Sequence, residues 1–306
     1  MLEGGLMLTL DTVSKTYRVG TFGGGAVEAV SRVTFDVRPG EVVSLIGESG
    51  SGKTTVGRMI LRLTPVTSGT ISLDGQDVSR LGGGALRGYY THVQGVFQDP
   101  FSSYNPVFKA DRVFELVRRS YLAGLSKSEW DDKRRASLEA VGLEPSDCLG
   151  KYPHQLSGGQ LQRILIARAL MLELRYLVAD EIISMLDAST RIDVLNLLGD
   201  LKARGLGILF VTHDLSLGNY ISDRTVILRR GRVVEQGPTA KVFAAPRHSY
   251  TRMLLACVSQ LHRKWEELPS GSTAPRTLGE LDESGLVAVD EAGDHLVAPE
   301  DAEVLA

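Results

Sequence analysis

A glycine-rich segment at residues 47–55 constrains this chain more than any other feature. It reads GESGSGKTT, with a short apolar run before it (41–46) and a helix-like run after it (56–63). Glycines let successive backbone N–H groups curl around a phosphate, where side chains would obstruct them, and the helix N-terminus adds partial positive charge. A strand, a glycine turn and a helix in this order predict an α/β nucleotide-binding fold rather than a merely flexible turn.

The side chains of this loop divide by the chemistry they offer. We expect Lys53 to reach the β- and γ-phosphates and the Thr54 hydroxyl to ligate Mg²⁺. The nucleotide-binding candidates in the loop are Gly47, Ser49, Gly50, Ser51, Gly52, Lys53, Thr54 and Thr55.

The charge of the chain is unevenly distributed. The formal net charge is −3, but residues 266–306 hold eleven acidic side chains against one base, Arg276, which leaves +7 for the rest. A mildly basic body suits a nucleotide ligand, although many soluble domains carry a similar surplus. Residues 269–279 are rich in Ser, Thr, Pro and Gly, which is typical of a polar linker.

Cysteine usage and hydropathy indicate the cellular compartment in which the chain is expected to fold. The two cysteines, Cys148 and Cys257, are far apart and outside any metal-ligand spacing, so a reducing cytosol is expected rather than a disulfide framework or a zinc site. We also expect neither a signal peptide nor a membrane span, because the N-terminus lacks a basic and apolar leader and no window holds 18 uncharged apolar residues.

The region before the loop predicts two strands, the first of them at the edge of a sheet. Leu6 to Val13 and Val27 to Val37 alternate in polarity, with Ser14–Tyr17 ending the first strand and a glycine-rich loop at 21–25 between them. Tyr17 is either an ordinary strand-end aromatic or a platform for stacking on adenine.

Several polar residues directly follow apolar runs that we expect to be strands. In α/β folds, ligands bind beyond the carboxyl ends of parallel strands. Gln98 after Val96-Phe97 is a Mg²⁺ or water ligand, or only a polar cap. Asp180 and Glu181 end the strand at 177–179; Asp180 would hold Mg²⁺ through water, and Glu181 would activate the attacking water. His213, at the end of another apolar strand, is catalytic or a hydrogen-bonded structural residue.

Helices account for most of the region between these strands. Residues 107–150 have helical periodicity and predict an insertion in the nucleotide core. Leu156–Gln160 reads LSGGQ, in which Ser157 suits an N-cap and the glycines leave first-turn N–H groups facing an anion; a capped helix without a ligand is the alternative. Another helix is predicted from Ser189 to Arg204, and 225–234 predicts a hairpin around Arg230-Gly231.

Together and in this order, the motifs resemble the ATPase subunit of an ABC transporter over residues 6–246. The resemblance assigns GESGSGKTT to the phosphate loop, Gln98 to the Q-loop and LSGGQ to the family signature, which adds Ser157, Gly158, Gly159 and Gln160 to the ATP-binding candidates. It assigns Asp180 and Glu181 to the carboxylate strand, Asp187 to the D-loop, His213 to the switch histidine and Tyr17 to adenine stacking. The phosphate loop, VFQDPFSSYNP and the stretch at 245–251 are most similar to the oligopeptide/dipeptide importer class.

The resemblance implies a complete architecture. It implies an ABC-type P-loop ATPase domain at 1–246, with an antiparallel β subdomain, a helical subdomain at about 99–170, and a C-terminal extension at 247–306. In that extension, 286–289 and 295–298 are expected to pair as a small hairpin, similar to the tail of the importer class.

The resemblance also implies partners and ligands. Two ATPase subunits would close head-to-tail over two ATP molecules with Mg²⁺, and we expect a heterodimer. The pair would dock at the cytoplasmic face of the membrane on two permease subunits, through residues 99–125, and an extracytoplasmic solute-binding protein would feed them. Peptides are the first expected solute and oligosaccharides the second; no nucleic acid is expected.

Three departures from the family pattern qualify these expectations. Ile182-Ile183 replaces the usual Pro-Thr after Glu181, which predicts reduced turnover. HPYT becomes His248-Ser249-Tyr250-Thr251, with no chemical role evident from the sequence. The extension holds only Cys257, so no iron–sulfur cluster is expected.

Two other functions remain open at this point. A soluble ABC ATPase acting on nucleic acid is one, although heptad runs, zinc spacings and a second cassette are missing from the sequence. A regulatory subunit with weak hydrolysis is the other, motivated by Ile182-Ile183. An exporter is disfavoured, since such subunits are commonly fused to a membrane domain.

Overall fold

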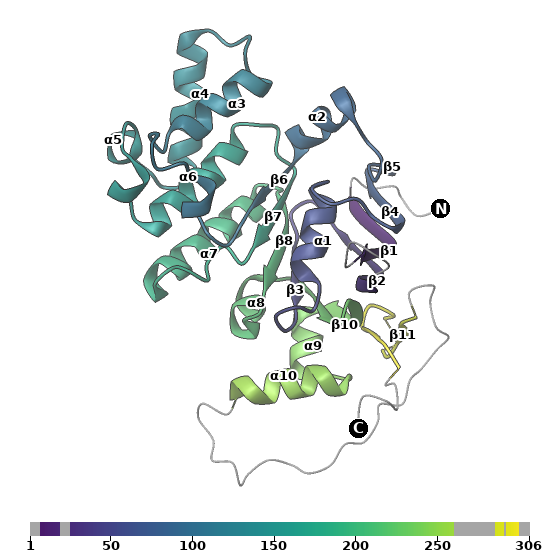
Figure 1. Cartoon of the computed structure of the whole chain (residues 1–306). Helices are drawn as coiled ribbons and strands as arrows, with labels where there is room; N and C mark the ends of the chain where they lie inside the picture. Colours follow the sequence, from purple (N-terminus) through teal and green to yellow (C-terminus); the bar gives the residue numbers. More distant parts are fainter. Residues whose placement is uncertain (1–6, 19–24, 260–284, 291, 300–306) are drawn as a thin grey trace. The chain divides into compact units, whose positions relative to one another are not determined.

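A computed structural model describes residues 7–18, 25–259, 285–290 and 292–299, the last three residues of the second range by backbone only. The chain forms two compact units (Figure 1). The first comprises residues 1–81 and 209–306, and the second comprises residues 82–208. In the described part, no helix combines the length and apolarity needed to cross a bilayer.

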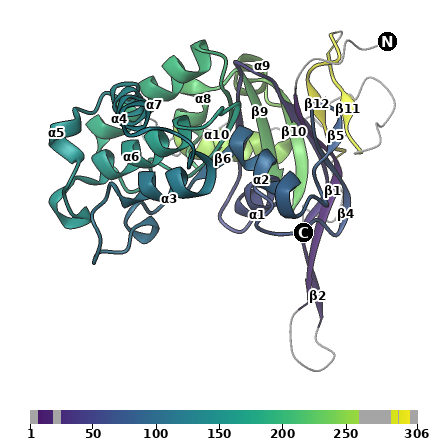
Figure 2. The same ribbon diagram turned by 90° about the horizontal axis from the view of Figure 1, so that it is seen from above.

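The first unit contains an antiparallel sheet of strand order β2-β1-β4-β5. Its strands are β1 (Leu8–Arg18), β2 (Ala26–Val37), β4 (Ser68–Leu73) and β5 (Gln76–Asp77). Figure 2 shows β1 and β2 as a long ribbon. The prediction that Ser14–Tyr17 ends the first strand is wrong, because β2 pairs with β1 as far as Arg18 and the register shifts around Val13 absorb the irregular polarity. The prediction of an edge strand is also wrong, because β1 pairs with β2 on one side and with β4 on the other. Most of the loop expected at 21–25 lies outside the described residues.

A second sheet of this unit holds the strand that leads into the phosphate loop. The strands of this sheet that belong to the first unit follow the order β11-β12-β10-β9-β3-β8, with β3 (Val42–Ile46), β8 (Gly207–Thr212), β9 (Arg224–Arg229) and β10 (Arg232–Pro238). β3 is buried along its whole length and runs parallel to β9. β9 and β10 form the predicted hairpin, and both turn residues, Arg230 and Gly231, have positive φ, as tight hairpin turns require.

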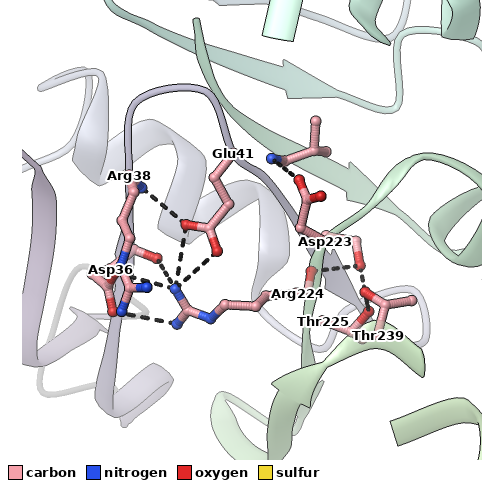
Figure 3. A network of polar contacts seen from close by, with 9 residues as sticks. Asp36, Arg38, Glu41, Asp223, Arg224, Thr225 and Thr239 are labelled. Atoms are coloured by element: carbon pink, nitrogen blue, oxygen red, sulfur yellow. Dashed lines mark hydrogen bonds and ion pairs between the residues drawn. The ribbon is translucent and has the colours of Figure 1, made fainter. Parts of the chain in front are cut away.

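A polar network fixes the entry to β3 (Figure 3). Arg224, at the start of β9, contacts Asp36 at 3.1 Å and Glu41 at 3.2 Å, and Asp223 accepts the Val42 N–H at 2.9 Å. Burial disfavours the guanidinium charge, but the two carboxylates outweigh it and raise the pKa of Arg224. The network therefore ties the turn before β3 to β9 and orients the strand that ends at the phosphate loop.

Among the described residues, the first unit also contains four helices, three of which contribute to an apolar cluster. They are α1 (Lys53–Ile60), α8 (Leu215–Ile221), α9 (Thr239–Ala244) and α10 (Ser249–Ser259). The cluster joins side chains of β3, α8, β9, β10, α9 and α10, namely Ile46, Leu215, Ile227, Val234, Val242 and Tyr250. Residues at the end of β3 and in the first turn of α10 thus share one core.

The predicted C-terminal hairpin is present and is part of the second sheet. β11 (Val287–Ala288) pairs with β12 (Leu296–Val297), and β12 pairs in turn with β10, on the side opposite β9. The polar linker expected at 269–279 lies outside the described residues.

The second unit combines two parallel strands with helices, and the helices predicted by the periodicity of 107–150 are present. β6 (Val93–Val96) and β7 (Tyr176–Asp180) pair in parallel. The helices are α2 (Gly83–His92), α3 (Arg112–Tyr121), α4 (Lys127–Glu139), α5 (Pro145–Cys148), α6 (Gly158–Leu170) and α7 (Ala188–Ala203), with 3-10 turns η1 (Phe101–Ser103) and η2 (Pro153–Gln155). The strand expected to reach Gln98 ends at Val96, two residues earlier.

Candidate functional site

The loop at residues 47–55 has the backbone of a phosphate cradle. Gly50 and Gly52 have φ of 81° and 106°, a region that L side chains rarely adopt. A Cβ at Gly47 would lie 2.1 Å from the Leu228 carbonyl oxygen, and one at Gly52 2.5 Å from that of Ala29. Glycine is therefore required at both positions, for close approach at Gly47 and for conformation and approach at Gly52.

The start of α1 has no side-chain cap. Its N-cap, Gly52, provides no side-chain hydrogen bond, and the first turn contains no acidic residue. The buried Ser51 hydroxyl has no hydrogen-bond partner among the described residues. Helix N–H groups without a cap, next to an unpartnered buried hydroxyl, fit the phosphates of a nucleotide.

Lys53 is buried and directed into the loop. Its Nζ donates to the carbonyl oxygens of Gly47 at 2.7 Å and Glu48 at 2.8 Å. The ammonium group therefore lies inside the cradle, on groups that a bound phosphate would replace.

Two further predicted residues belong to the first unit. Tyr17, in β1, is 38% exposed, and Lys15 Nζ lies 5.1 Å from its ring centroid. His213 is exposed between β8 and α8, and the next residue, Asp214, caps α8 by accepting the N–H groups of Ser216 and Leu217. His213 is thus held at a strand-to-helix junction.

The carboxylates at the end of β7 belong to the second unit. Asp180 is buried, whereas Glu181 is half-buried and has a positive φ of 51°, which is costly for a residue with a side chain. Ser184 supports this bend, since its N–H and hydroxyl both donate to the Glu181 carbonyl, at 3.1 and 2.9 Å. Ile182 and Ile183 are both buried, so the two side chains that stand in place of the family's Pro-Thr are accommodated in the core.

The LSGGQ segment starts α6 with a reciprocal cap. The Ser157 hydroxyl accepts the Gln160 N–H at 3.2 Å, and the Gln160 side chain accepts the Ser157 N–H at 2.9 Å. The predicted N-cap is confirmed. Gly158 and Gly159 form the first turn, and a Cβ at Gly159 would lie 2.2 Å from Thr190, so only glycine lets α6 approach α7 this closely.

Asp187 caps α7, next to this contact. Its carboxylate accepts the Thr190 N–H at 3.0 Å and the hydroxyl groups of Ser189 and Thr190. These hydrogen bonds, with the Ser189 hydroxyl as the largest contribution, lower the pKa of Asp187 and keep it ionised. The D-loop and signature candidates are therefore neighbours within the second unit.

The comparison with known families decides what this arrangement is. A family model described as "ABC transporter" matches residues 30–184, from β2 through the phosphate loop and the signature to Ser184. This chain belongs to the ABC transporter family. It is an ABC ATPase with an α/β fold, as the sequence predicts.

The relatives of this ABC ATPase include import subunits. A Brucella ovis protein named as a peptide import ATP-binding protein is 42% identical over 254 residues, 82% of this chain and 78% of its own length. A glutathione import ATP-binding protein of Salmonella choleraesuis is 40% identical over 80% of this chain, but over only 42% of its own length. A second family model, the C-terminal region of oligopeptide/dipeptide transporters, matches residues 234–285.

A solved structure shows the same fold. A dimeric ATP-binding cassette in a post-hydrolysis state, bound to ADP and Pi, is 29% identical and superimposes with a TM-score of 0.67 over 76% of this chain and 98% of its own. ATP binding and ATP hydrolysis are thus the activities of this ABC ATPase.

Sequence reasoning missed residues that support the Q-loop. Gln162, a fully buried residue of α6, donates through Nε2 to the Phe97 carbonyl at 3.3 Å, directly before the exposed Gln98. Tyr104, after Gln98, donates its hydroxyl to the Leu161 carbonyl at 2.9 Å, and burial raises the pKa of its phenol. Polar residues in an apolar helix were the available signal, but the contacts bridge more than 50 residues.

Proposed function

We propose that this ABC ATPase powers a solute importer whose first candidate cargo is peptide and whose second is oligosaccharide. The observation that carries the proposal is the presence, on one chain, of the ABC core match at 30–184 and the oligopeptide/dipeptide transporter C-terminal match at 234–285. The name of the Brucella ovis relative supports the same class of cargo.

The phosphate loop supplies the binding half of the proposed chemistry. The loop N–H groups and the start of α1 receive the phosphates, and Lys53 exchanges its two carbonyl partners for the β- and γ-phosphate oxygens. Gly47, Ser49, Gly50, Ser51, Gly52 and Thr55 shape the cradle, and Tyr17 stacks on the adenine.

Glu181, Gln98 and His213 supply the hydrolytic half of the proposed chemistry. Glu181 orients the attacking water and accepts its proton, with Gln98 and His213 placing that water and the γ-phosphate. Thr54, Asp180 and Gln98 would hold Mg²⁺, which neutralises the phosphate charge when bound.

A second ATPase subunit completes each site in this proposal, and we expect it to be a different chain. The signature residues Ser157, Gly158, Gly159 and Gln160 of one subunit cover the ATP held by the loop of the other, and Asp187 lies at the same junction. The dimeric ADP-bound cassette supports this arrangement.

The membrane partners are proposed on the same basis. Two permease subunits would bind at residues 99–125, where large apolar side chains are exposed at Phe101, Val107, Phe108 and Leu116. A solute-binding protein would select the cargo outside, and this chain would sit on the cytoplasmic face. We propose neither a nucleic-acid partner nor an iron–sulfur cluster; the Cys257 side chain lies outside the described residues.

The proposed division of the chain follows these roles. Residues 1–246 form the ATPase domain, with the helical subdomain at about 99–170, and residues 247–306 form the extension. The alternative function, a regulatory subunit with weak hydrolysis, is motivated by Ile182-Ile183, since these residues replace a rigid turn residue and a hydroxyl beside Glu181.

Two experiments test the proposal. Purified from its membrane, the chain should bring with it a permease pair and a second ATPase, and the ligand of the accompanying binding protein identifies the cargo. Glu181→Gln should bind ATP normally and lower turnover in the assembly about 10²- to 10⁴-fold. The exposed Asp193→Asn, the same chemical change on α7, should leave turnover unchanged. Rapid and equal turnover in all three proteins would remove Glu181 from its role, whereas turnover that is equally slow in all three would favour the regulatory subunit.

A further inference from the structure

The peptide group that joins Gly47 to Glu48, at the start of the phosphate loop, is held from both ends. Its carbonyl oxygen accepts from Lys53 Nζ at 2.7 Å. Its N–H donates to the hydroxyl of Tyr250 at 3.2 Å, a contact that spans 202 positions of the chain. Tyr250 comes from α10, in the region that matches the oligopeptide/dipeptide transporter C-terminus.

The environment of Tyr250 fixes its ring under the loop. The side chain is 2% exposed and belongs to the cluster that contains Ile46, the residue before Gly47, and Leu215 of α8. The Arg229 guanidinium lies 4.8 Å from the ring centroid. Burial raises the pKa of the Tyr250 phenol, so the group remains a neutral hydroxyl. A rigid, neutral acceptor suits a backbone N–H that must keep one direction.

The first turn of α10 is itself held by a buried carboxylate. Glu235 of β10, which is fully buried, accepts the N–H groups of Arg247 at 2.8 Å and His248 at 3.0 Å, and the ring of His295 at 2.7 Å. His248 Nδ1 then accepts the Tyr250 N–H at 3.1 Å. The altered HPYT segment and the C-terminal hairpin therefore converge on the backbone of Tyr250.

Glu235 remains ionised in this setting. Burial disfavours its charge, but the hydrogen bond with His295, followed by those from its other neighbours, outweighs burial and lowers the pKa of Glu235. A charged acceptor makes these hydrogen bonds stronger than neutral ones, which keeps α10 in register with the loop.

We propose that Tyr250 is a positioning residue for ATP, acting through the 47–48 peptide; the inference rests on the proposed role of the phosphate loop. In the structure, Lys53 and Tyr250 both restrain this peptide. Once Lys53 moves to the phosphates, the Tyr250 hydroxyl keeps the peptide from turning. Its loss should therefore weaken the ATP-bound state more than the free state.

Tyr250→Phe in the full-length chain tests this inference, since it keeps the ring in the cluster and removes only the hydroxyl. We expect the Kd for the fluorescent analogue mant-ATP and the KM for ATP to rise about three- to tenfold, which is the change in affinity that the loss of one hydrogen bond produces. The kcat should stay within about twofold of the wild-type value. Tyr89→Phe, on a buried tyrosine of α2, is the matched control and should change neither constant.

The outcomes separate this inference from the proposed function. The inference is supported if Tyr250→Phe weakens ATP binding, Tyr89→Phe does not, and Lys53→Ala abolishes it. Unchanged affinity in Tyr250→Phe while Lys53→Ala loses binding overturns it and leaves the proposed function standing. If the wild-type chain binds no mant-ATP, the proposed function fails and takes the inference with it.

A measurement on the wild-type chain makes the test independent of how the variant folds. Site-resolved hydrogen exchange without nucleotide should show the Glu48 amide protected relative to the neighbouring Ser49 and Gly50 amides, although all three residues are exposed. Equal, fast exchange at all three positions would show that the phenol does not hold this peptide and would overturn the inference.

Discussion

The helices α1 and α6 both begin at glycine-rich family motifs, but their first turns differ. α1 begins without a side-chain cap, beside the unpartnered Ser51 hydroxyl. α6 begins with Ser157 and Gln160 satisfying each other's backbone N–H groups. One N-terminus is therefore ready for an anion within a single chain, whereas the other is already partly satisfied by its own side chains.

This difference fits the order of events in the proposed cycle. A first turn without a side-chain cap can direct its N–H groups at phosphate, so ATP binds first at α1 in this cycle. A capped first turn gains less, so α6 suits a second contact, made when another subunit brings it to a nucleotide already in place. The predictions below test each side of the comparison, starting with the largest effect.

Gly52→Ala should impair ATP binding at the uncapped start of α1. The new Cβ would lie 2.5 Å from the Ala29 carbonyl oxygen at a φ of 106°, so the loop must change shape. We expect the affinity for ATP to fall about 100-fold or more, which corresponds to about 3 kcal/mol. Equilibrium binding of mant-ATP measures it.

Gly75→Ala is the matched control, with a φ of 78° and no atom within 4 Å of the added Cβ. It should lower stability by about 1 kcal/mol and leave ATP affinity unchanged. If Gly52→Ala binds ATP as tightly as Gly75→Ala, the cradle geometry does not govern binding.

Ser157→Ala should show whether the capped start of α6 contributes to ATP turnover or is only an ordinary helix cap. α4 begins with the same reciprocal arrangement, in which Ser126 accepts the Glu129 N–H and Glu129 accepts the Ser126 N–H. Ser157→Ala and Ser126→Ala should each lower the free energy of unfolding by about 1 kcal/mol. Only Ser157→Ala should also reduce ATP turnover in the assembled transporter, by about tenfold or more. Parallel losses of stability with equal turnover would make α6 a capped helix and nothing more.

Glu129→Gln gives the smallest effect, by turning the cap of α4 into that of α6. Hydrogen bonds from the Ser126 hydroxyl and N–H lower the pKa of Glu129, so its stabilising contribution is present above the ordinary value of 4.5 and is lost as pH falls through the lowered value. Urea unfolding should show a shallower acid dependence in Glu129→Gln between about pH 5 and pH 3. Wild-type and variant curves that stay parallel across this range would contradict it.

The sequence predicted the local features of this ABC ATPase well. The strand before the loop, the Ser157 cap and the hairpin around Arg230-Gly231 depend on neighbouring residues, so their signals lie within a few positions. The C-terminal hairpin was predicted for the same reason.

Pairing between distant segments of the chain could not be predicted from the sequence. β1 continues through Ser14–Tyr17 because β2 supplies partners, and β12 joins β10 across 60 residues. The contact of Tyr250 with Glu48 left no local signal, so the altered HPYT segment had no role to assign. Position relative to distant backbone, rather than residue type, determines what these side chains do.

Hydrogen exchange in the assembly, with Glu181→Gln to retain ATP, tests the central claim most directly. We predict that ATP and Mg²⁺ protect the amides of residues 47–55 in the isolated chain, and those of both 47–55 and 157–160 in the assembly with the second ATPase. Protection confined to 47–55 in the assembly would show that the signature turn does not meet the nucleotide and would contradict the two-sided site.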